Sequence, residues 1–174
     1  MLIVSAHRGY PRWVNSGADF IEIDVRRDSR GVIIDSHDEP QPGRNHPTFA
    51  EILEAAAGRI GLHLDMKEAG YERELVGRAL ERFPSDKIIA TSDFEESIRA
   101  IKRNFPQVRV SPIDFVALDQ QYATEKALGS YRVPIWVWTV DDQNLMERFI
   151  KDERISGLIT NRPDLALELR SARS

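Results

Sequence analysis

Short strand-like segments alternate with helical segments along this 174-residue chain, and this alternation restricts the fold more than any other feature. The β-branched and apolar runs predict eight core strands, over residues 2–6, 19–25, 60–66, 87–91, 108–110, 115–118, 134–140 and 157–160. Strands that alternate with helices are typical of a parallel α/β sheet. Eight of them predict a (β/α)₈ TIM-type barrel, built as a single domain over residues 1–174.

The predicted barrel is a shortened one, because barrels of this class begin at roughly 200 residues. Some crossover helices must therefore be missing, and the links at 10–18 and 111–114 are too short to contain them. An open, incomplete barrel and a doubly wound sheet are the alternatives. Helices lost from the outside would leave exposed flanks, and a homodimer is one way to cover them.

Residues 19–39 predict a β-hairpin added after the second strand. Glu22 and Asp24 lie on one face of an alternating strand, and the sequence D-S-R-G at 28–31 is typical of a tight turn. A loop of two or four residues would pair residues whose numbers sum to about 59 or 61, and would place His37 opposite one of the two carboxylates. A loop of three residues would reverse that parity.

Composition excludes several classes of protein. The net charge of −4 gives no electrostatic basis for nucleic acid as a partner. The absence of cysteine excludes disulfides and thiolate metal sites, and is typical of a reducing compartment. The start of the chain lacks the basic region of a signal peptide, and no apolar run approaches the ~18 residues of a transmembrane segment. The sequence therefore predicts a cytoplasmic protein without a transmembrane segment.

Histidine, basic and acidic side chains and one tryptophan stand where predicted strands end: His7, Arg8, Glu22, Asp24, His37, Asp65, Lys67 and Trp138. In a barrel these ends share one rim, which carries the active sites of this fold. Carboxylates without cysteine are suited to one hard divalent cation, Mg²⁺ or Ca²⁺. Arg8 and Lys67 are suited to a phosphate, and two histidines to acid and base catalysis. Together these residue types predict metal-assisted cleavage of a phosphate ester.

Six motifs in order resemble the glycerophosphodiester phosphodiesterase family, within the phospholipase C-like phosphodiesterases. They are A-H-R-G (6–9), G-A-D-F-I-E-I-D-V (17–25), V-I-I-D-S-H-D (32–38), L-H-L-D-M-K (62–67), W-V-W-T-V-D-D (136–142) and G-L-I-T-N-R-P (157–163). The resemblance implies a (β/α)₈ barrel with a hairpin after the second strand. It implies a small-molecule glycerophosphodiester substrate, cleaved to glycerol 3-phosphate and an alcohol.

The resemblance also implies a role for each candidate residue. His7 and His37 would be the catalytic acid/base pair. The metal ligands would be Glu22, Asp24 and Asp65. The substrate and its phosphate would be bound by Arg8, Lys67 and Trp138. Asp65 stands where the family usually has glutamate, and Asn161 where aspartate is common.

Two alternatives follow from these departures and from the segments that the chain lacks relative to the family. The first is a cyclising lyase similar to lysophospholipase D or sphingomyelinase D, whose branch also has an aspartate at the third metal position. The second is a non-catalytic remnant barrel that binds a phosphorylated ligand. His63, two residues deeper than Asp65, is interpreted as a hydrogen-bonded interior histidine, and Trp136 as barrel filling.

Overall fold

The computed structural model describes residues 1–41 and 43–173. Eight strands of the described residues run parallel in one sheet, as the sequence predicts. They are β1 (Ile3–Ala6), β2 (Phe20–Arg27), β4 (Gly61–Met66), β5 (Ile88–Ser92), β6 (Arg109–Val110), β7 (Val116–Asp119), β8 (Ile135–Trp138) and β9 (Ile155–Thr160).

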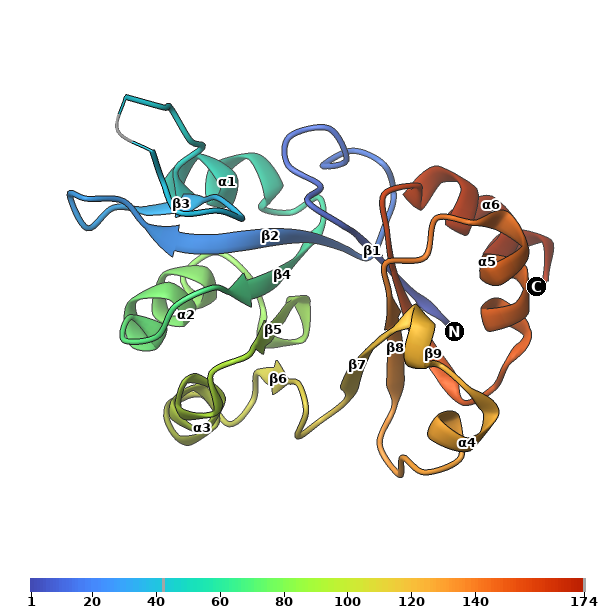
Figure 1. The fold of residues 1–174 in the computed structure, drawn as a ribbon. Coiled ribbons are helices and arrows are strands. Elements are labelled where there is room, and N and C mark those ends of the chain that lie inside the picture. The colour runs from blue at the N-terminus through green and yellow to red at the C-terminus, as the bar shows by residue number, and fades with distance from the viewer. Residues whose placement is uncertain (42, 174) are drawn as a thin grey trace.

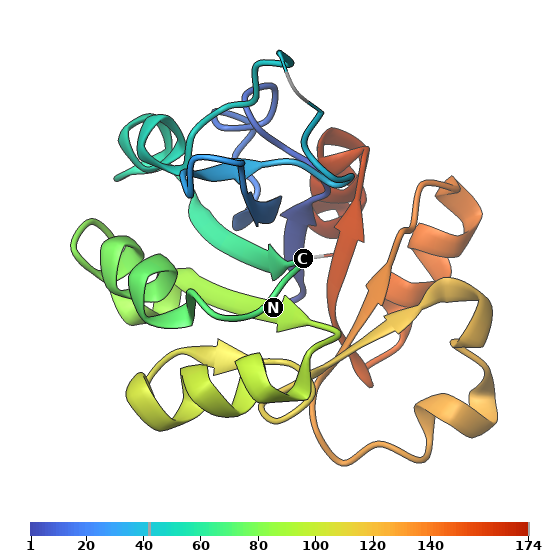
Figure 2. The same ribbon diagram turned by 60° about the vertical axis from the view of Figure 1, so that its left-hand side comes forward.

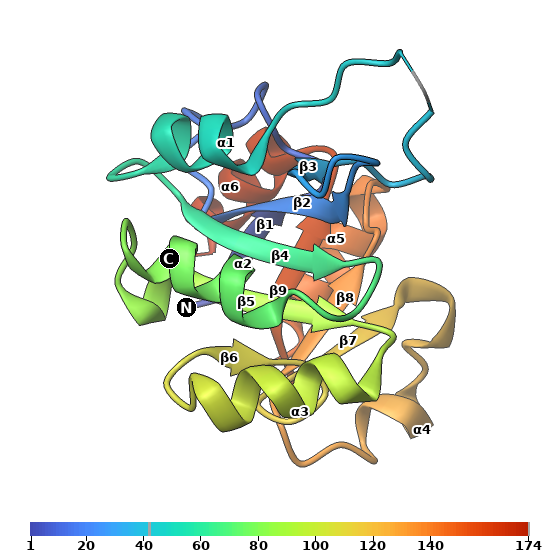
Figure 3. The ribbon, with the colours of Figure 1, turned by 90° about the vertical axis from the view of Figure 1, so that its left-hand side faces the viewer.

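Helices cover the outside of this sheet (Figure 1). Across residues 1–41 and 43–173 they are α1 (Phe49–Ala56), α2 (Glu72–Leu80), α3 (Glu95–Asn104), α4 (Glu125–Leu128), α5 (Gln143–Lys151) and α6 (Pro163–Ala172). Figure 3 shows β2, β4 and β5 side by side, with α2 and α3 over them. No helix in the described part of the chain has both the length and the apolar character to cross a membrane.

Thr48 followed three residues later by Glu51 is the sequence pattern of a capping box, and this capping box begins α1. The side chain of Thr48 accepts a hydrogen bond from the backbone N–H of Glu51, and the Glu51 carboxylate accepts one from the backbone N–H of Thr48 at 2.7 Å. The sequence at 121–128 suggests one helix, but the structure has a 3₁₀ turn at Gln120–Tyr122 followed by α4, because Thr124 caps a separate helix start.

The barrel is open between β6 and β7. The sheet order is β6-β5-β4-β2-β1-β9-β8-β7, and these two edge strands share no ladder within the described residues. Figure 2 shows the green and the orange strands of the two halves curving toward each other. Ala117 N–H donates to Ser111 Oγ at 3.2 Å across the opening. The predicted losses of helix are confirmed, because residues 10–18 and 111–114 form only turns and bends.

The hairpin after β2 is present, but its predicted register is wrong. Strand β3 (Ile33–Asp35) pairs antiparallel with β2, and Val25 lies opposite Asp35. The paired numbers therefore have an even sum instead of the odd sum expected for a loop of two or four residues. His37 does not face Glu22 or Asp24 through strand pairing.

A three-residue loop causes this change of parity, and Asp28 closes it. Its carboxylate accepts hydrogen bonds from the N–H groups of Arg30 and Val32, both at 2.9 Å. Gly31 completes the loop at φ 80°, a conformation that side chains other than glycine rarely adopt. The turn therefore has one residue more than the tightest hairpin and shifts β3 by one position.

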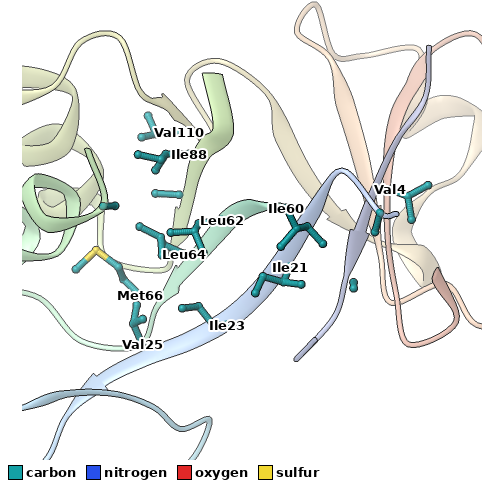
Figure 4. Packing of buried hydrophobic residues seen from close by; sticks show 14 of the residues in the cluster. Val4, Ile21, Ile23, Val25, Ile60, Leu62, Leu64, Met66, Ile88 and Val110 are labelled. Atoms are coloured by element: carbon teal, nitrogen blue, oxygen red, sulfur yellow. The ribbon is translucent and has the colours of Figure 1, made fainter. Parts of the chain in front are cut away.

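Apolar side chains pack on both faces of the sheet, one layer outside it under the helices and one inside the barrel. The outward residues of β2 and β4, among them Ile21, Ile23, Leu62 and Leu64, pack beneath the helices (Figure 4). A second cluster fills the lower part of the barrel interior and consists of Phe20, Ile89, Phe115, Trp136 and Ile159. The inward positions above this cluster are polar, and they form the site described next.

Candidate active site

A cavity of about 520 Å³ opens above the interior cluster, at the carboxyl ends of the strands. Among its lining residues are all eight that the sequence singled out: His7, Arg8, Glu22, Asp24, His37, Asp65, Lys67 and Trp138. They come from β1, β2, β4, β8 and the chain just after these strands and β3. The structure therefore brings the whole predicted set together.

Parallel register places the acidic side chains at two levels. Asp24 lies beside Asp65, and Asp65 lies beside Thr91 of β5. Glu22 lies one level deeper, beside His63. Residues paired in a parallel sheet point to the same side, so the pleat aims all of them into the barrel.

The two cationic residues hold these carboxylates in place. The backbone N–H of Arg8 donates to Glu22 Oε2 at 2.7 Å, and Arg8 Nε lies 2.9 Å from Asp24 Oδ2. Lys67 Nζ lies 3.0 Å from Asp24 Oδ1 and also pairs with Asp65 Oδ2. Arg8 has a φ of 46°, a conformation that residues other than glycine rarely adopt, and both its backbone N–H and its guanidinium contact residues of β2.

Burial and mutual repulsion make the negative charges of the acidic cluster unfavourable unless a cation lies beside them. Burial raises the pKa of Glu22 well above its usual value, and the neighbouring charges of Asp24 and Asp65 raise it further. Burial alone would lower the pKa of Lys67, but the negative charges of Asp65 and Asp24 outweigh burial and the pKa is raised. The cluster is thus a place where an added cation would be stabilised.

The donor set fits a hard divalent cation. One oxygen from each of Glu22, Asp24 and Asp65 lies within 4.8 Å of the others. Oxygens that surround one ion at about 2.1–2.5 Å lie within about 5 Å of each other, so this spacing suits Mg²⁺ or Ca²⁺. Glu22 and Asp24 are 3% and 2% exposed, so two of the three candidate ligands lie on β2 away from bulk water.

The two histidines follow β1 and β3, and each has a different partner. His7 Nδ1 lies 2.9 Å from Asn161 Oδ1, and His37 Nδ1 lies 2.8 Å from Asp38 Oδ1. His37 reaches the cavity because the hairpin ladder ends at Asp35 and the chain leaves the strand direction. Its position therefore depends on the loop after β3 and not on the predicted pairing.

A carboxylate outside the predicted set orients His7. Asn161 donates to Asp141 Oδ2 through its amide at 2.7 Å and to Asp141 Oδ1 through its backbone N–H at 2.8 Å. Burial would raise the pKa of Asp141, but the hydrogen bonds from Asn161 and Thr160 outweigh it and lower the pKa. Asp141 and Asn161 both follow the ends of strands. The sequence therefore predicts that they lie at the rim, but it does not predict their contact with each other.

Sequence reasoning missed Thr91 altogether. Its hydroxyl donates to Asp65 Oδ1 at 2.8 Å and lies 3.1 Å from His63 Nε2. Ser92 and Asp93, which follow the predicted strand at 87–91, also line the cavity. The alternation of β5 predicts which of its side chains face inward, and Thr91 is one of them. The structure shows that it lies in register with Asp65.

The wall opposite the acidic cluster is more apolar. Pro112, Val116, Ala117 and Ile159 line it, and Trp138 stands at its outer edge with 41% of its surface exposed. An exposed indole next to a polar cluster is available for contact with a ligand. Trp136, two residues earlier, is 1% exposed in the interior cluster, as predicted for barrel filling.

Comparison with known proteins gives matches among solved structures only, because no family profile and no curated protein matches the sequence. A glycerophosphodiester phosphodiesterase from Parabacteroides distasonis is 20% identical with a TM-score of 0.78, covering 99% of this chain and 98% of its own. A phosphodiesterase from Oleispira antarctica, solved in complex with the product sn-glycerol-3-phosphate, is 15% identical with a TM-score of 0.81 and coverages of 97% and 96%.

A third similar structure is the glycerophosphodiester phosphodiesterase from Agrobacterium tumefaciens, 18% identical with a TM-score of 0.72, over 98% of this chain and 100% of that one. At such identities the likeness concerns the fold, and it extends over nearly the full length of every chain. The resemblance expected from the six motifs is thus confirmed at the level of the fold: this chain has the barrel of the glycerophosphodiester phosphodiesterases.

Proposed function

We propose that this protein is a metal-dependent phosphodiester hydrolase that cleaves glycerophosphodiesters to glycerol 3-phosphate and an alcohol. The observation that supports this most is that one cavity is lined by His7 and His37 together with three clustered carboxylates, an arginine and a lysine. A structure of the same fold holds sn-glycerol-3-phosphate as its product, which supports the same product here.

Arg8 and Lys67 bind the phosphate of the substrate in this proposal. Both already point into the cavity and pair with Asp24, so each can exchange part of that contact for a phosphate oxygen. A divalent cation, when held by Glu22, Asp24 and Asp65, supplies positive charge that neutralises the phosphoryl oxygens. Trp138 contacts the organic part of the substrate at the apolar wall.

His7 is the general base. Asn161 donates a hydrogen bond from its amide N–H to Asp141, so its Oδ1 faces His7 and accepts a hydrogen bond from the Nδ1–H of the ring. The lone pair of His7 is then on Nε2, which takes the proton from the attacking water. The water oxygen forms a bond to phosphorus, and the bond from phosphorus to the alcohol oxygen breaks.

His37 is the general acid. Its hydrogen bond lowers the pKa of Asp38, so an anion stays beside the ring. His37 contacts a carboxylate, whereas His7 contacts a neutral amide, and this difference assigns the role of proton donor to His37. It donates this proton to the leaving alcohol oxygen. Attack by a hydroxyl of the substrate itself would give a cyclic phosphate with the same two histidines.

The test is cleavage with identification of the products. Glycerophosphocholine, glycerophosphoethanolamine and lysophosphatidylcholine are incubated with Mg²⁺, Ca²⁺ or EDTA, and products are followed by ³¹P NMR. We expect glycerol 3-phosphate from the two deacylated glycerophosphodiesters with metal and none with EDTA. Lysophosphatidylcholine keeps its acyl chain, so its hydrolysis would give a lysophosphatidic acid instead. His7→Gln and His37→Gln should each lower kcat by about 10²–10⁴-fold, the range of general acid–base catalysis.

Asp24→Asn is compared with Asp86→Asn to separate the site from a general loss of charge. Asp86 is exposed in the turn before β5, at the opposite end of the barrel, and its variant should keep full activity. A cyclic phosphate product would favour the cyclising lyase. No cleavage of any ester, with a cation still bound in calorimetry, would favour the remnant binding barrel.

The assembly and the location in the cell are part of the same proposal. A homodimer would cover the flanks that the missing helices leave, and a stable monomer in sedimentation at high concentration would contradict it. A cytoplasmic location is proposed from the chain's lack of cysteine.

A further inference from the structure

His63 lies directly beneath the acidic cluster and takes no part in the proposed reaction. It is 1% exposed, and both of its ring nitrogens have partners. Nδ1 lies 3.1 Å from Ser5 Oγ, and Nε2 lies 3.1 Å from Thr91 Oγ1. The ring also meets Trp136 edge-on at 6.0 Å between centroids, so packing fixes its plane.

Hydrogen-bond chemistry fixes the direction of every proton in this chain of contacts. Asp65 Oδ1 can only accept, so the hydroxyl of Thr91 donates to it at 2.8 Å. Thr91 has one hydroxyl proton, and its oxygen must therefore accept from His63 Nε2. A buried imidazole whose hydrogen-bond partners are both hydroxyls is neutral, because an imidazolium there would lack an anion in contact. Its Nδ1 then accepts from Ser5.

We propose that Ser5, His63 and Thr91 form a donor chain that orients Asp65 as a metal ligand. The inference rests on the proposed cation site. Asp65 is short, and its two described side-chain partners are Lys67 and Thr91. Lys67 is long and turns toward the phosphate in the proposed reaction. Thr91 lies on β5, which pairs with β4, and keeps its contact with Asp65. The hydrogen bond from His63 fixes the position of its hydroxyl.

Cation affinity is the readout that separates orientation from a general structural role. Calorimetric titration with Mg²⁺ or Ca²⁺ alone compares the wild type with Thr91→Val, Thr91→Ser and Ser97→Ala. Ser97 is a matched control, because its buried hydroxyl, like the hydroxyl of Thr91, donates to a carboxylate, here that of Glu72 on α2. We expect Thr91→Val to weaken binding about 10–100-fold, as for other residues that orient metal ligands. Thr91→Ser should restore it, and Ser97→Ala should leave it unchanged.

A second measurement needs no variant. Long-range ¹H–¹⁵N NMR of the wild type reports which ring nitrogen of His63 carries the proton, and we expect Nε2. A proton on Nδ1 would overturn the inference, as would a Thr91→Val protein that binds the cation as tightly as the wild type. A wild type that binds no divalent cation would overturn the proposed metal site as well, so the two failures can be told apart.

Discussion

At the scale of single residues, Tyr71 joins the helix layer to the barrel. Its hydroxyl donates to the backbone carbonyl of Val25 at 2.7 Å, and the guanidinium of Arg27 lies 4.9 Å from its ring centroid. Burial, with a further contribution from the charge of Glu68, raises the pKa of Tyr71 above its usual value. The folded protein therefore keeps this phenol neutral at a pH where the unfolded chain ionises it.

Tyr71→Phe should show a loss of stability that depends on pH. At pH 8 the variant loses one buried hydrogen bond, and we expect its free energy of unfolding to fall by about 1 kcal/mol. Above pH ~10 ionisation of Tyr71 stabilises only the unfolded wild type, so the difference should shrink. Urea unfolding of both proteins at pH 8 and pH 11 measures this. A difference of the same size at both pH values would contradict the raised pKa.

At the scale of elements, the hairpin of β2 and β3 depends on one glycine. Gly31 has a φ of 80°, and nothing lies within 4 Å of the position that a Cβ would take. The cost of a side chain is therefore backbone strain without a clash. This turn sets the register of β3, and β3 leads directly into the loop that carries His37.

Gly31→Ala should lower the free energy of unfolding by about 1–2 kcal/mol, the cost of a left-handed conformation for an L-residue. Gly31→Asn should lower it less, because asparagine tolerates this conformation. Thermal and urea unfolding of the three proteins give the order. An alanine variant as stable as the wild type would mean that the loop adopts a different turn, and the observed register would then be in question.

At the scale of the whole molecule, the barrel has a packed base and a polar top. Trp136 packs tightly against β9 at the base. A Cβ added to Gly157 would lie only 2.5 Å from the indole, so the base has no room for it. The interior cluster around Trp136 supports the level of Glu22 and His63 from below. Stability of the base and geometry of the site are therefore coupled.

Gly157→Ala should destabilise the protein by about 1–3 kcal/mol, because added volume in a packed interior forces strain. Gly77→Ala in α2 is the control, since nothing lies within 4 Å of its added Cβ and alanine favours a helix. It should stabilise the protein or leave it unchanged. Differential scanning calorimetry measures both, and a neutral Gly157→Ala would show that the base is looser than described.

Local pattern was enough to predict most elements and the members of the site. Apolar alternation predicted the strands, and the capping box of Thr48 and Glu51 predicted the start of α1. The links too short for a helix predicted where the barrel lacks its outer layer. Strand ends share a rim in this fold, so position along the chain was sufficient to group the eight candidate residues.

Contacts between distant segments were decided by the tertiary structure alone. The register of β3 followed from hydrogen bonds of Asp28 within a loop whose length local propensity did not fix. Thr91 became a partner of Asp65 through the pairing of β4 with β5, and Asp141 became a partner of Asn161 across β8 and β9. Sequence determines which side chains face inward, because the pleat has a period of two. Which of these side chains touch depends on how strands far apart in the chain align, and that alignment is set by the packing of the whole barrel.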